Sequence, residues 1–396
     1  MAKLGDIFVK QIVGEWGNEC NNESNGVFVL RTTNFSNSGV INYDKVVKRD
    51  IPDNKVEEKK LKYGDIILEK SGGTDKTPVG RVVFCDNKIE SDVYLCNNFT
   101  QAMRVDNSIA IPKYVFYLMY YFHQIGITDL LQSKTTGIRN LRLRDYLNTD
   151  IKLPNLAEQE HCVIYLDKLT VLISLRQQQL EKLDELVKSR FIEMFGRIQD
   201  NKKGYSIVTI GDVCSLIKDG THQTPEYTED VKNGYKFLSS KDVMSQKIDW
   251  SNIKYISASL HERLYSSLKP QRNDILMSKN GVNYGVAAIN DSDEIFDIYV
   301  SLALLRPSKS IHPVYLRCVI NSADTKNQFD SSIKGIGVPN LHLGEIKNTK
   351  ILLPPIDLQN QFAEFVKQTD KSKLAVQKSL GQLETLKKSL MQKYFG

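Results

Sequence analysis

Hydrophobic positions between residues 158 and 194 repeat every three to four residues, with no glycine or proline among them. The repeating apolar residues are Leu166, Leu169, Ile173, Leu180, Leu183, Val187 and Met194, and Arg176 and Arg190 are the polar exceptions. This heptad spacing predicts one continuous helix of about 37 residues, which would extend for about 55 Å. An apolar stripe of that length cannot be buried against one small domain, so it needs a helical partner.

A second heptad stretch near the end of the sequence supplies that partner. Its repeating positions are Val376, Leu380, Leu383, Leu390 and Tyr394, and Lys387 interrupts them. Pro154 and Pro354 each stand just before one stretch, where proline is tolerated. We predict long helices over residues 156–199 and 356–396 that pack on each other as an antiparallel coiled coil. The alternative is that each is an ordinary core helix.

Both stretches belong to a longer internal repeat with an offset of 200 residues. Asn-Leu-Arg-Leu at 140–143 returns as Asn-Leu-His-Leu at 340–343, and Phe-Gly at 195–196 returns at 395–396. Residues 140–196 align with residues 340–396 without a gap, so coincidence does not explain the match. The upstream segments match more loosely, which predicts two related domains whose ends are alike and whose middles have diverged.

The diverged middles contain both strand and helix patterns. Short β-prone runs flanked by Gly, Asn and Asp occur at 65–68, 79–84, 274–277 and 285–289, and helical runs that begin near a proline occur at 114–123 and 313–322. The predicted fold class is α+β. It consists of two repeated mixed α/β domains, residues 1–155 and 200–355, separated by the two long helices in a pseudo-twofold repeat.

Composition narrows the choice of partner and compartment only slightly. Residues 1–200 carry 27 Lys and Arg against 27 Asp and Glu, whereas residues 201–396 carry 26 against 20, so the net charge of +6 lies in the second half. This excess permits an anionic partner without requiring one. The six cysteines form no C-x-x-C pair, and neither a signal segment nor a membrane-spanning apolar run is present. We expect a cytoplasmic protein.

Motifs of catalysis and cofactor binding are missing from the sequence. Neither a phosphate-binding loop nor a dinucleotide fingerprint occurs, and Pro354-Pro355 lacks the flanking residues of an adenine methyltransferase motif. A Pro-Asp and Glu-x-Lys pattern over residues 52–60 resembles a nuclease metal site, but its spacing is too short for two strands and favours a solvated charge run. The six histidines show no metal-ligand spacing. We therefore expect no catalytic residues, no metal site and no cofactor bound by this chain.

Polar, glycine-bearing loops recur at matching places in both domains. The candidate DNA-contacting residues in them are Lys70, Ser71, Gly72, Gly73, Thr74, Lys76, Arg81, Thr136 and Arg139 in the first domain and Gly220, Thr221, His222, Gln223, Thr224, Lys241, Ser278, Lys279, Asn280, Asn283 and Lys334 in the second. Glycine lets backbone N–H groups approach phosphate, hydroxyl and basic side chains bind it, and Asn, Gln and Arg can pair with base edges. The alternative is that these loops are plain surface turns.

Several of these segments resemble the specificity subunit of type I restriction-modification systems. The resemblance is carried by Leu-Gly-Asp at 4–6, by the strands Gly-Asp-Ile-Ile-Leu at 64–68 and Asn-Asp-Ile-Leu-Met at 273–277, and by Asp-Gly-Thr-His with Thr-Pro over 219–225. The Leu-Pro signature that closes each domain also fits, although Leu358-Gln359 stands where the first copy has Glu158-Gln159. The first domain lacks the Asp-Gly-Thr-His loop.

The resemblance implies a non-catalytic subunit of a larger DNA-modifying and DNA-cutting enzyme. Two target-recognition domains would each bind half of a bipartite site on double-stranded DNA, with the two helices as a spacer. The subunit would bind two modification subunits, which use S-adenosylmethionine to methylate adenine, and two restriction subunits, which use ATP and Mg²⁺. The alternatives are a stand-alone methyltransferase or nuclease and a coiled-coil scaffold that does not bind DNA.

Overall fold

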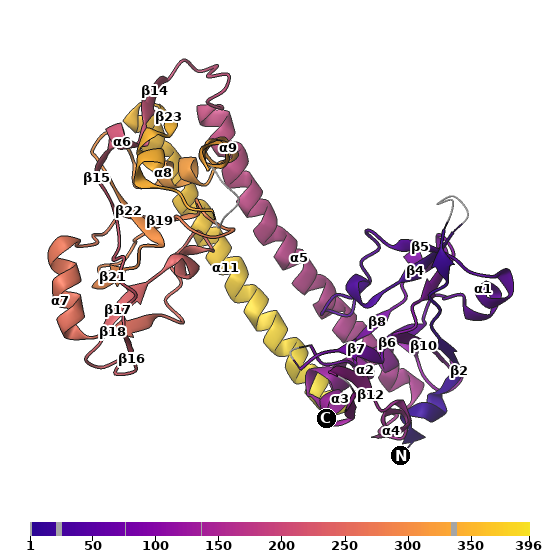
Figure 1. The fold of residues 1–396 in the computed structure, drawn as a ribbon. Coiled ribbons are helices and arrows are strands. Elements are labelled where there is room, and N and C mark those ends of the chain that lie inside the picture. Colours follow the sequence, from indigo (N-terminus) through magenta and orange to yellow (C-terminus); the bar gives the residue numbers. More distant parts are fainter. Residues whose placement is uncertain (1, 21–25, 76, 136, 334–338) are drawn as a thin grey trace. The chain divides into compact units, whose positions relative to one another are not determined.

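A computed structural model describes residues 2–20, 26–75, 77–135, 137–333 and 339–396, and it divides the chain into two compact units (Figure 1). Unit 1 comprises Met1–Gln177 and Lys378–Gly396, and unit 2 comprises Gln178–Gln377. Both boundaries lie inside the long helices, α5 (Leu156–Phe195) and α11 (Ile356–Phe395). Each unit is therefore built from one mixed α/β domain together with a segment of both helices. None of the helices in these ranges has the length and apolarity needed to cross a membrane.

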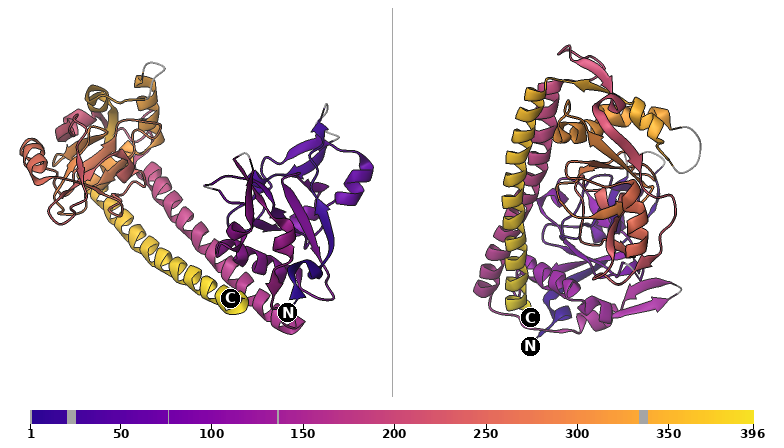
Figure 2. Two further views of the ribbon diagram at one scale, coloured as in Figure 1. Left: turned by 60° about the horizontal axis from the view of Figure 1, so that its bottom comes forward. Right: turned by 90° about the vertical axis from the view of Figure 1, so that its left-hand side faces the viewer.

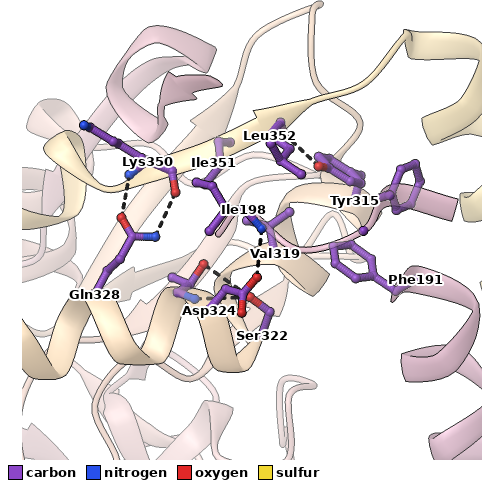
Figure 3. Close-up of a pocket in the computed structure, with 13 residues that line it drawn as sticks. Phe191, Ile198, Tyr315, Val319, Ser322, Asp324, Gln328, Lys350, Ile351 and Leu352 are labelled. Carbon is purple, nitrogen blue, oxygen red and sulfur yellow. Dashed lines mark hydrogen bonds between the residues drawn. The ribbon is translucent and has the colours of Figure 1, made fainter. Parts of the chain in front are cut away.

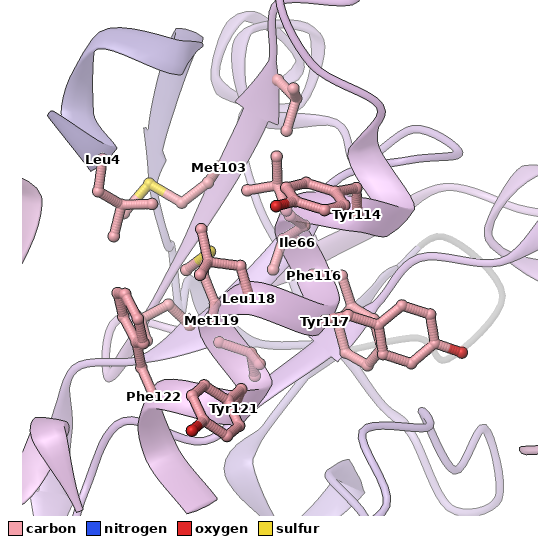
Figure 4. Close-up of a cluster of buried hydrophobic side chains, with 14 of the residues drawn as sticks. Leu4, Ile66, Met103, Tyr114, Phe116, Tyr117, Leu118, Met119, Tyr121 and Phe122 are labelled. Carbon is pink, nitrogen blue, oxygen red and sulfur yellow. The ribbon is translucent and has the colours of Figure 1, made fainter. Parts of the chain in front are cut away.

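The main sheet of unit 1 is antiparallel and has the strand order β2-β10-β6-β8. These strands are β2 (Phe8–Val13), β10 (Thr100–Val105), β6 (Ile66–Glu69) and β8 (Val82–Phe84). The helix α2 (Pro112–Gln124) begins with its proline in the first turn, where no backbone N–H is needed, and most of its aromatic residues are buried. Figure 4 shows part of the resulting core, including Ile66 and Met103 from the sheet and Tyr114 and Leu118 from α2.

A second sheet of unit 1 has the order β3-β5-β4-β9, in which β4 and β9 are parallel. The remaining elements are short. The elements not yet given are β1 (Ala2–Lys3), η1 (Leu4–Ile7), β3 (Asn18–Glu19), β4 (Val27–Leu30), η3 (Thr32–Asn34), β5 (Val47–Asp50), α1 (Asp53–Lys59), β7 (Ser71–Gly73), η4 (Asn87–Glu90), β9 (Tyr94–Cys96), α3 (Ile127–Leu130), β11 (Gln132–Thr135), β12 (Ile138–Leu141), α4 (Leu143–Leu147) and β13 (Asp150–Ile151).

Unit 2 repeats both sheets with the same connectivity, in the orders β15-β22-β19-β20 and β16-β18-β17-β21. Its elements are β14 (Ser206–Thr209), α6 (Ile210–Val213), β15 (Cys214–Asp219), β16 (Tyr227–Thr228), β17 (Tyr235–Leu238), η5 (Ser240–Val243), β18 (Lys254–Ile256), α7 (Ala258–Ser267), β19 (Ile275–Ser278), β20 (Ala287–Ile289), β21 (Phe296–Ile298), β22 (Leu302–Pro307), α8 (Pro313–Ile320), α9 (Ala323–Ser332), α10 (Leu343–Asn348) and β23 (Lys350–Leu353). The predicted α+β class with a twofold internal repeat is confirmed.

The heptad positions of the long helices are buried in three cases and half-buried in the others. Leu166 and Leu169 of α5 and Val376 of α11 are at most 7% exposed, whereas the positions around them are largely solvated. Within unit 2 the two helices run antiparallel (Figure 2), because Lys373 pairs with Asp184 at 2.5 Å while Phe362 packs against Phe195. Each long helix contributes a segment to both units. The apolar heptad positions therefore pack against the domain core of a unit as well as against the other helix.

A fully buried glutamine near the start of each long helix ties that helix to its domain. The Gln159 side chain accepts a hydrogen bond from the Ile111 backbone N–H (2.8 Å) and donates to the Pro154 carbonyl oxygen (2.9 Å). In unit 2, Gln359 accepts from the backbone N–H of His312 (2.8 Å) and donates to the Pro354 carbonyl oxygen (2.8 Å). The repeated glutamine of the sequence is therefore a buried clamp between helix and domain.

We expect Gln159→Ala and Gln359→Ala each to lower the free energy of unfolding by about 2–4 kcal/mol, because each leaves buried backbone groups without a partner. Thermal and denaturant unfolding of the whole chain measures the loss. Gln361→Ala, an exposed glutamine on α11, is the matched control and should change stability by less than about 0.5 kcal/mol. Equal effects of the buried and exposed substitutions would contradict the clamp.

Candidate nucleic-acid interface

Directly after β15, the backbone at Gly220 passes so close to the backbone at Ile298 that only glycine fits there. We call this close approach the glycine crossing. A Cβ atom on Gly220 would lie 2.0 Å from the Ile298 carbonyl oxygen, far inside any permitted contact. The crossing is fixed by hydrogen bonds from the Thr221 N–H to the Ile298 oxygen (3.0 Å) and from the Gly220 N–H to the Leu302 oxygen (3.3 Å). These contacts fix the point from which the following loop residues extend.

Unit 1 contains the same crossing, at Gly14. A Cβ atom there would lie 1.8 Å from the Asn97 carbonyl oxygen, and the Glu15 N–H donates to the Cys96 oxygen at 2.8 Å. The first domain lacks the Asp-Gly-Thr-His motif, but its backbone forms the equivalent loop with Gly14, Glu15 and Trp16. The sequence held a usable signal, because Gly14 precedes Gly220 by 206 residues, the offset that also separates the two Gly-Asp pairs at 5–6 and 211–212.

The second pair of predicted loops also occupies equivalent places. The Lys70 N–H donates to the Phe99 oxygen (3.0 Å), and the Leu141 N–H donates to the Lys70 oxygen (2.8 Å). In unit 2 the Lys279 N–H donates to the Ser301 oxygen (2.9 Å), and the Leu341 N–H donates to the Lys279 oxygen (2.9 Å). Each lysine loop therefore lies beside the segment that precedes α4 or α10, as the recurrence of the loops suggested.

Several predicted contact residues are occupied inside the protein. Lys279 is 5% exposed and its ammonium lies 2.5 Å from the Asp219 carboxylate, so it links two loops rather than facing solvent. Arg81 makes a two-pronged ion pair with Glu69 (2.8 and 3.0 Å), which raises the pKa of its guanidinium. The fully buried Ser278 hydroxyl donates to the Asn283 carbonyl oxygen at 2.8 Å.

Other predicted residues are partly covered. Lys70 is half-buried, and burial lowers the pKa of its ammonium. Ser71 donates to the Asn140 side chain (2.5 Å), and Gly73 is buried where β7 pairs with Arg139 of β12. The Arg139 guanidinium binds the Asp75 carboxylate at 3.1 Å. Within unit 1 the 70–74 loop and the 138–141 strand thus form one connected surface.

The exposed predicted residues gather around the glycine crossing of unit 2. Thr221 is half-buried, whereas His222, Gln223, Thr224 and Lys241 are exposed. The Lys241 segment adjoins the crossing because the Ser240 N–H donates to the Ser301 hydroxyl (3.0 Å). Asn283 of unit 2 and Gly72 and Thr74 of unit 1 are also exposed, and the Asn280 side-chain oxygen is buried without a hydrogen bond from any described group. Lys76, Thr136 and Lys334 lie outside the described residues.

Unit 1 has a cluster around its crossing that the sequence did not indicate. Glu15 binds Lys59 of α1 at 2.7 Å and Lys55 at 3.3 Å, and the hydrogen bond from Lys59 lowers the pKa of the Glu15 carboxyl group. The Trp16 ring lies under the Arg49 guanidinium, with 4.0 Å from the guanidinium carbon to the ring centroid. Aromatic and basic side chains therefore meet at the position of the unit 2 loop.

The nuclease-like pattern of the sequence does not have the geometry of a metal site. Asp53 and Glu58 of the nuclease-like pattern lie on the single short helix α1, whereas such a metal site needs two adjacent strands. No group of three potential metal-ligating side chains occurs among the residues that the structure describes. A cavity at the end of α5 has a volume of about 30 Å³ and is lined by Phe191, Gln328 and Lys350, among others. The Gln328 side chain donates to the Lys350 carbonyl oxygen (2.9 Å) and accepts from the Lys350 backbone N–H (2.9 Å) (Figure 3).

The sequence matches the type I restriction modification DNA specificity domain twice, over residues 1–185 and 202–387. The chain belongs to this family. The resemblance drawn from the loops and the Leu-Pro signatures is therefore confirmed, and both copies of this specificity domain coincide with the structural repeat.

Relatives agree with this assignment. The chain is 23% identical over 290 residues to the type I restriction enzyme MjaVIII specificity subunit of Methanocaldococcus jannaschii, an alignment that covers 69% of this chain and 68% of the relative. It is 22% identical over 308 residues to the EcoBI specificity subunit of Escherichia coli, covering 70% and 64%. The matched part thus spans about two thirds of the length of each relative.

Solved structures share the fold of this chain. The S subunit of a type I restriction-modification system from M. genitalium aligns with a TM-score of 0.58 at 15% identity, covering all of this chain and 95% of that one. A chain from a structure concerned with assembly and conformational transition of a type I system aligns with a TM-score of 0.56 at 18% identity, covering 99% and 96%. The two α/β units and both long helices therefore have counterparts in known members.

We expect Gly14→Ala and Gly220→Ala each to destabilise the chain strongly, by about 3 kcal/mol or more, because the new methyl group would overlap a backbone carbonyl. Unfolding measurements on each variant test this. Gly344→Ala in α10 is the matched control, since a Cβ atom there meets nothing within 4 Å, and it should leave stability unchanged or raise it. A normal melting temperature for the Gly14 or Gly220 variant would refute the crossing.

Proposed function

We propose that this chain is the DNA-binding, non-catalytic specificity subunit of a type I restriction-modification enzyme. The observation that carries the proposal is the glycine crossing, which occurs in both units and is followed by different side chains in each, half-buried in unit 1 and mostly exposed in unit 2. A common backbone frame with divergent side chains suits two readers of two different half-sites. Methyl transfer with S-adenosylmethionine and cleavage with ATP and Mg²⁺ would belong to modification and restriction subunits.

DNA contact in unit 2 is supported by the mixture of side chains around its crossing. His222 and Gln223 are exposed and can pair with base edges, while Thr224 and Lys241 can bind phosphate. Pro225 is buried directly after them, which anchors the far end of the loop and limits its freedom. Buried Lys279 supports this loop through Asp219, so we assign it a structural role and no longer a phosphate contact.

Partner binding is supported by an unusual face of α5 within unit 1. Ile164, Tyr165, Val171, Leu172 and Leu175 are 40–56% exposed. Ile164, Val171 and Leu175 lie on the side of α5 opposite the buried Leu166 and Leu169, and Tyr165 and Leu172 flank them on one side. On a helix these spacings place the five side chains on one continuous face. Their combined apolar area fits a helix of a partner subunit, for which the modification subunit is our candidate.

We expect two substitutions near the unit 2 crossing to affect DNA binding differently. Gln223→Ala should reduce discrimination at one base pair by about 1–3 kcal/mol with little change in salt dependence. Lys241→Ala should weaken binding to all duplexes and lower the salt slope by about one. The target would first be identified by methylome sequencing of a host with and without this chain, and matched and mismatched duplexes would then be titrated at several salt concentrations.

The control for these titrations is Lys202→Ala, which removes an exposed lysine that lies outside the loops of the interface. It should behave like the parent protein. If the Gln223 and Lys241 variants also behaved like the parent, the loop would not be the interface. If methylation patterns did not depend on the chain at all, the proposed function itself would be wrong.

We expect the double variant Val171→Glu with Leu175→Glu to lose copurification with the modification subunit, because two charges cannot be buried in an apolar helix contact. Duplex binding by the chain should be retained. Leu374→Glu on α11 is the matched control, since Leu374 is 68% exposed but is flanked on its helix by lysines and other polar residues. Retained copurification of the double variant would exclude this face as the partner surface.

A further inference from the structure

Arg49 of unit 1 is held in a geometry that leaves its hydrogen-bonding edge uncommitted. Its guanidinium carbon lies 4.0 Å from the centroid of the Trp16 ring, and its Nε atom is buried without a hydrogen-bond partner among the described residues. The nearest carboxylate, that of Glu19, is 3.7 Å from Nη1 and belongs to a side chain that is 93% exposed. The Trp16 ring therefore restrains the position of the guanidinium, and no described acceptor satisfies its donors.

Two other partly buried arginines, one in each domain, are fully engaged within the fold. Arg104 makes a two-pronged ion pair with Asp65 (2.8 Å for both bonds), and Arg306 makes the same pair with Asp274 at the same distances. These pairs raise the pKa of each guanidinium and satisfy its donors inside the fold. Arg49 differs from these two because its contacts among the described residues, the Trp16 ring and the 3.7 Å approach to Glu19, satisfy no donor in hydrogen-bond geometry. Its side chain is 17% exposed and its Nε atom is buried, so a ligand can reach only the remaining part of the guanidinium.

The place of Arg49 in the fold also points to a ligand. Trp16 follows the Gly14 crossing by two residues, as His222 follows Gly220. On β5, Arg49 lies opposite Val27, and the equivalent residue of unit 2, opposite Tyr235, is the fully buried Ile256. The arginine is therefore a feature of one unit, as a residue that reads one of two different half-sites must be.

We propose that Arg49, held over the Trp16 ring, recognises a guanine in the half-site bound by unit 1. This inference rests on the proposed function, since it names a base contact within that interface. A guanidinium presents two parallel N–H donors that match O6 and N7 of guanine in the major groove. Stacking on Trp16 fixes the orientation beforehand, so less conformational entropy is lost on binding. Lys55 and Lys59 beside Glu15 supply positive charge nearby.

The test is selection of bound duplexes from a randomised double-stranded pool, with the full chain assembled with its modification subunit. The parent should select a bipartite motif, and Arg49→Ala should lose about 5- to 150-fold of its preference for guanine at one position of one half. Arg49→Lys should lose most of the same preference although it keeps the charge. Arg49→Gln should shift that position toward adenine, because a glutamine amide pairs with N6 and N7 of adenine.

Lys48→Ala is the matched control. Lys48 is the neighbouring residue on β5, and its ammonium lies over Phe28 on the other face of the strand, 4.7 Å from the ring centroid. It should leave the motif unchanged. Melting temperatures of all variants show whether a change in motif accompanies a change in folding, and Arg49→Lys together with Trp16→Phe provides conservative replacements if the alanine variant does not fold.

Three results would overturn or separate the claims. An unchanged motif for both Arg49→Lys and Arg49→Gln would overturn guanine recognition by Arg49. Uniformly weaker binding with an unchanged motif and a smaller salt slope would make Arg49 a phosphate contact and would also overturn it. Failure of the parent to select any motif would instead refute the proposed function, so the two failures are distinguishable.

Discussion

A buried amide at the start of each long helix is the constraint on which both units depend. Gln159 and Gln359 are fully buried, and each bonds one N–H and one carbonyl of the adjoining chain at nearly identical distances. A buried amide that is satisfied at both ends tolerates few alternative positions. The direction in which the helix leaves its domain is thereby fixed in each unit. The heptad seam can then bring the other helix against the same core, where Phe395 meets Tyr114 in unit 1 and Phe195 meets Tyr315 in unit 2.

The glycine crossings separate what must stay constant from what is free to change. At Gly14 and Gly220 the requirement is purely steric, because a neighbouring carbonyl oxygen occupies the space of any side chain. The residues that follow meet no such requirement, and they differ completely between the units, with Glu15 and Trp16 in one and Thr221 and His222 in the other. A rigid frame with replaceable surface side chains is how one fold can serve two different base sequences.

Sequence reasoning predicted the elements whose patterns are local. Hydrophobic periodicity predicts the long helices α5 and α11, and a proline in the first turn marks the start of α2 and α8. Matching residues at a fixed offset reveal the internal repeat. It could not predict that the compact units would divide inside the long helices, because that depends on which core Phe395 enters after folding. It also missed the Gly14 crossing, because the close approach to Asn97 constrains only the glycine and the neighbouring residues differ from those around Gly220, so that the spacing of 206 residues is its only trace in the sequence.

The role of a basic residue also depends on contacts that form only in the folded chain. Counting charges in the sequence therefore does not locate the interface. Lys279 and Arg49 are equally basic in the sequence, but the first is buried against Asp219 and the second lies on an aromatic ring beside the Gly14 loop. Removing an ammonium from water is tolerable only when a counter-charge replaces the lost hydration, so Lys279 is committed to holding the Gly220 loop in place. A guanidinium is more weakly hydrated and can rest on a π-face with its donors still unsatisfied. The half of the chain with balanced charge therefore contains the arginine that we propose as a base contact, whereas Lys279, in the more basic half, acts within the fold.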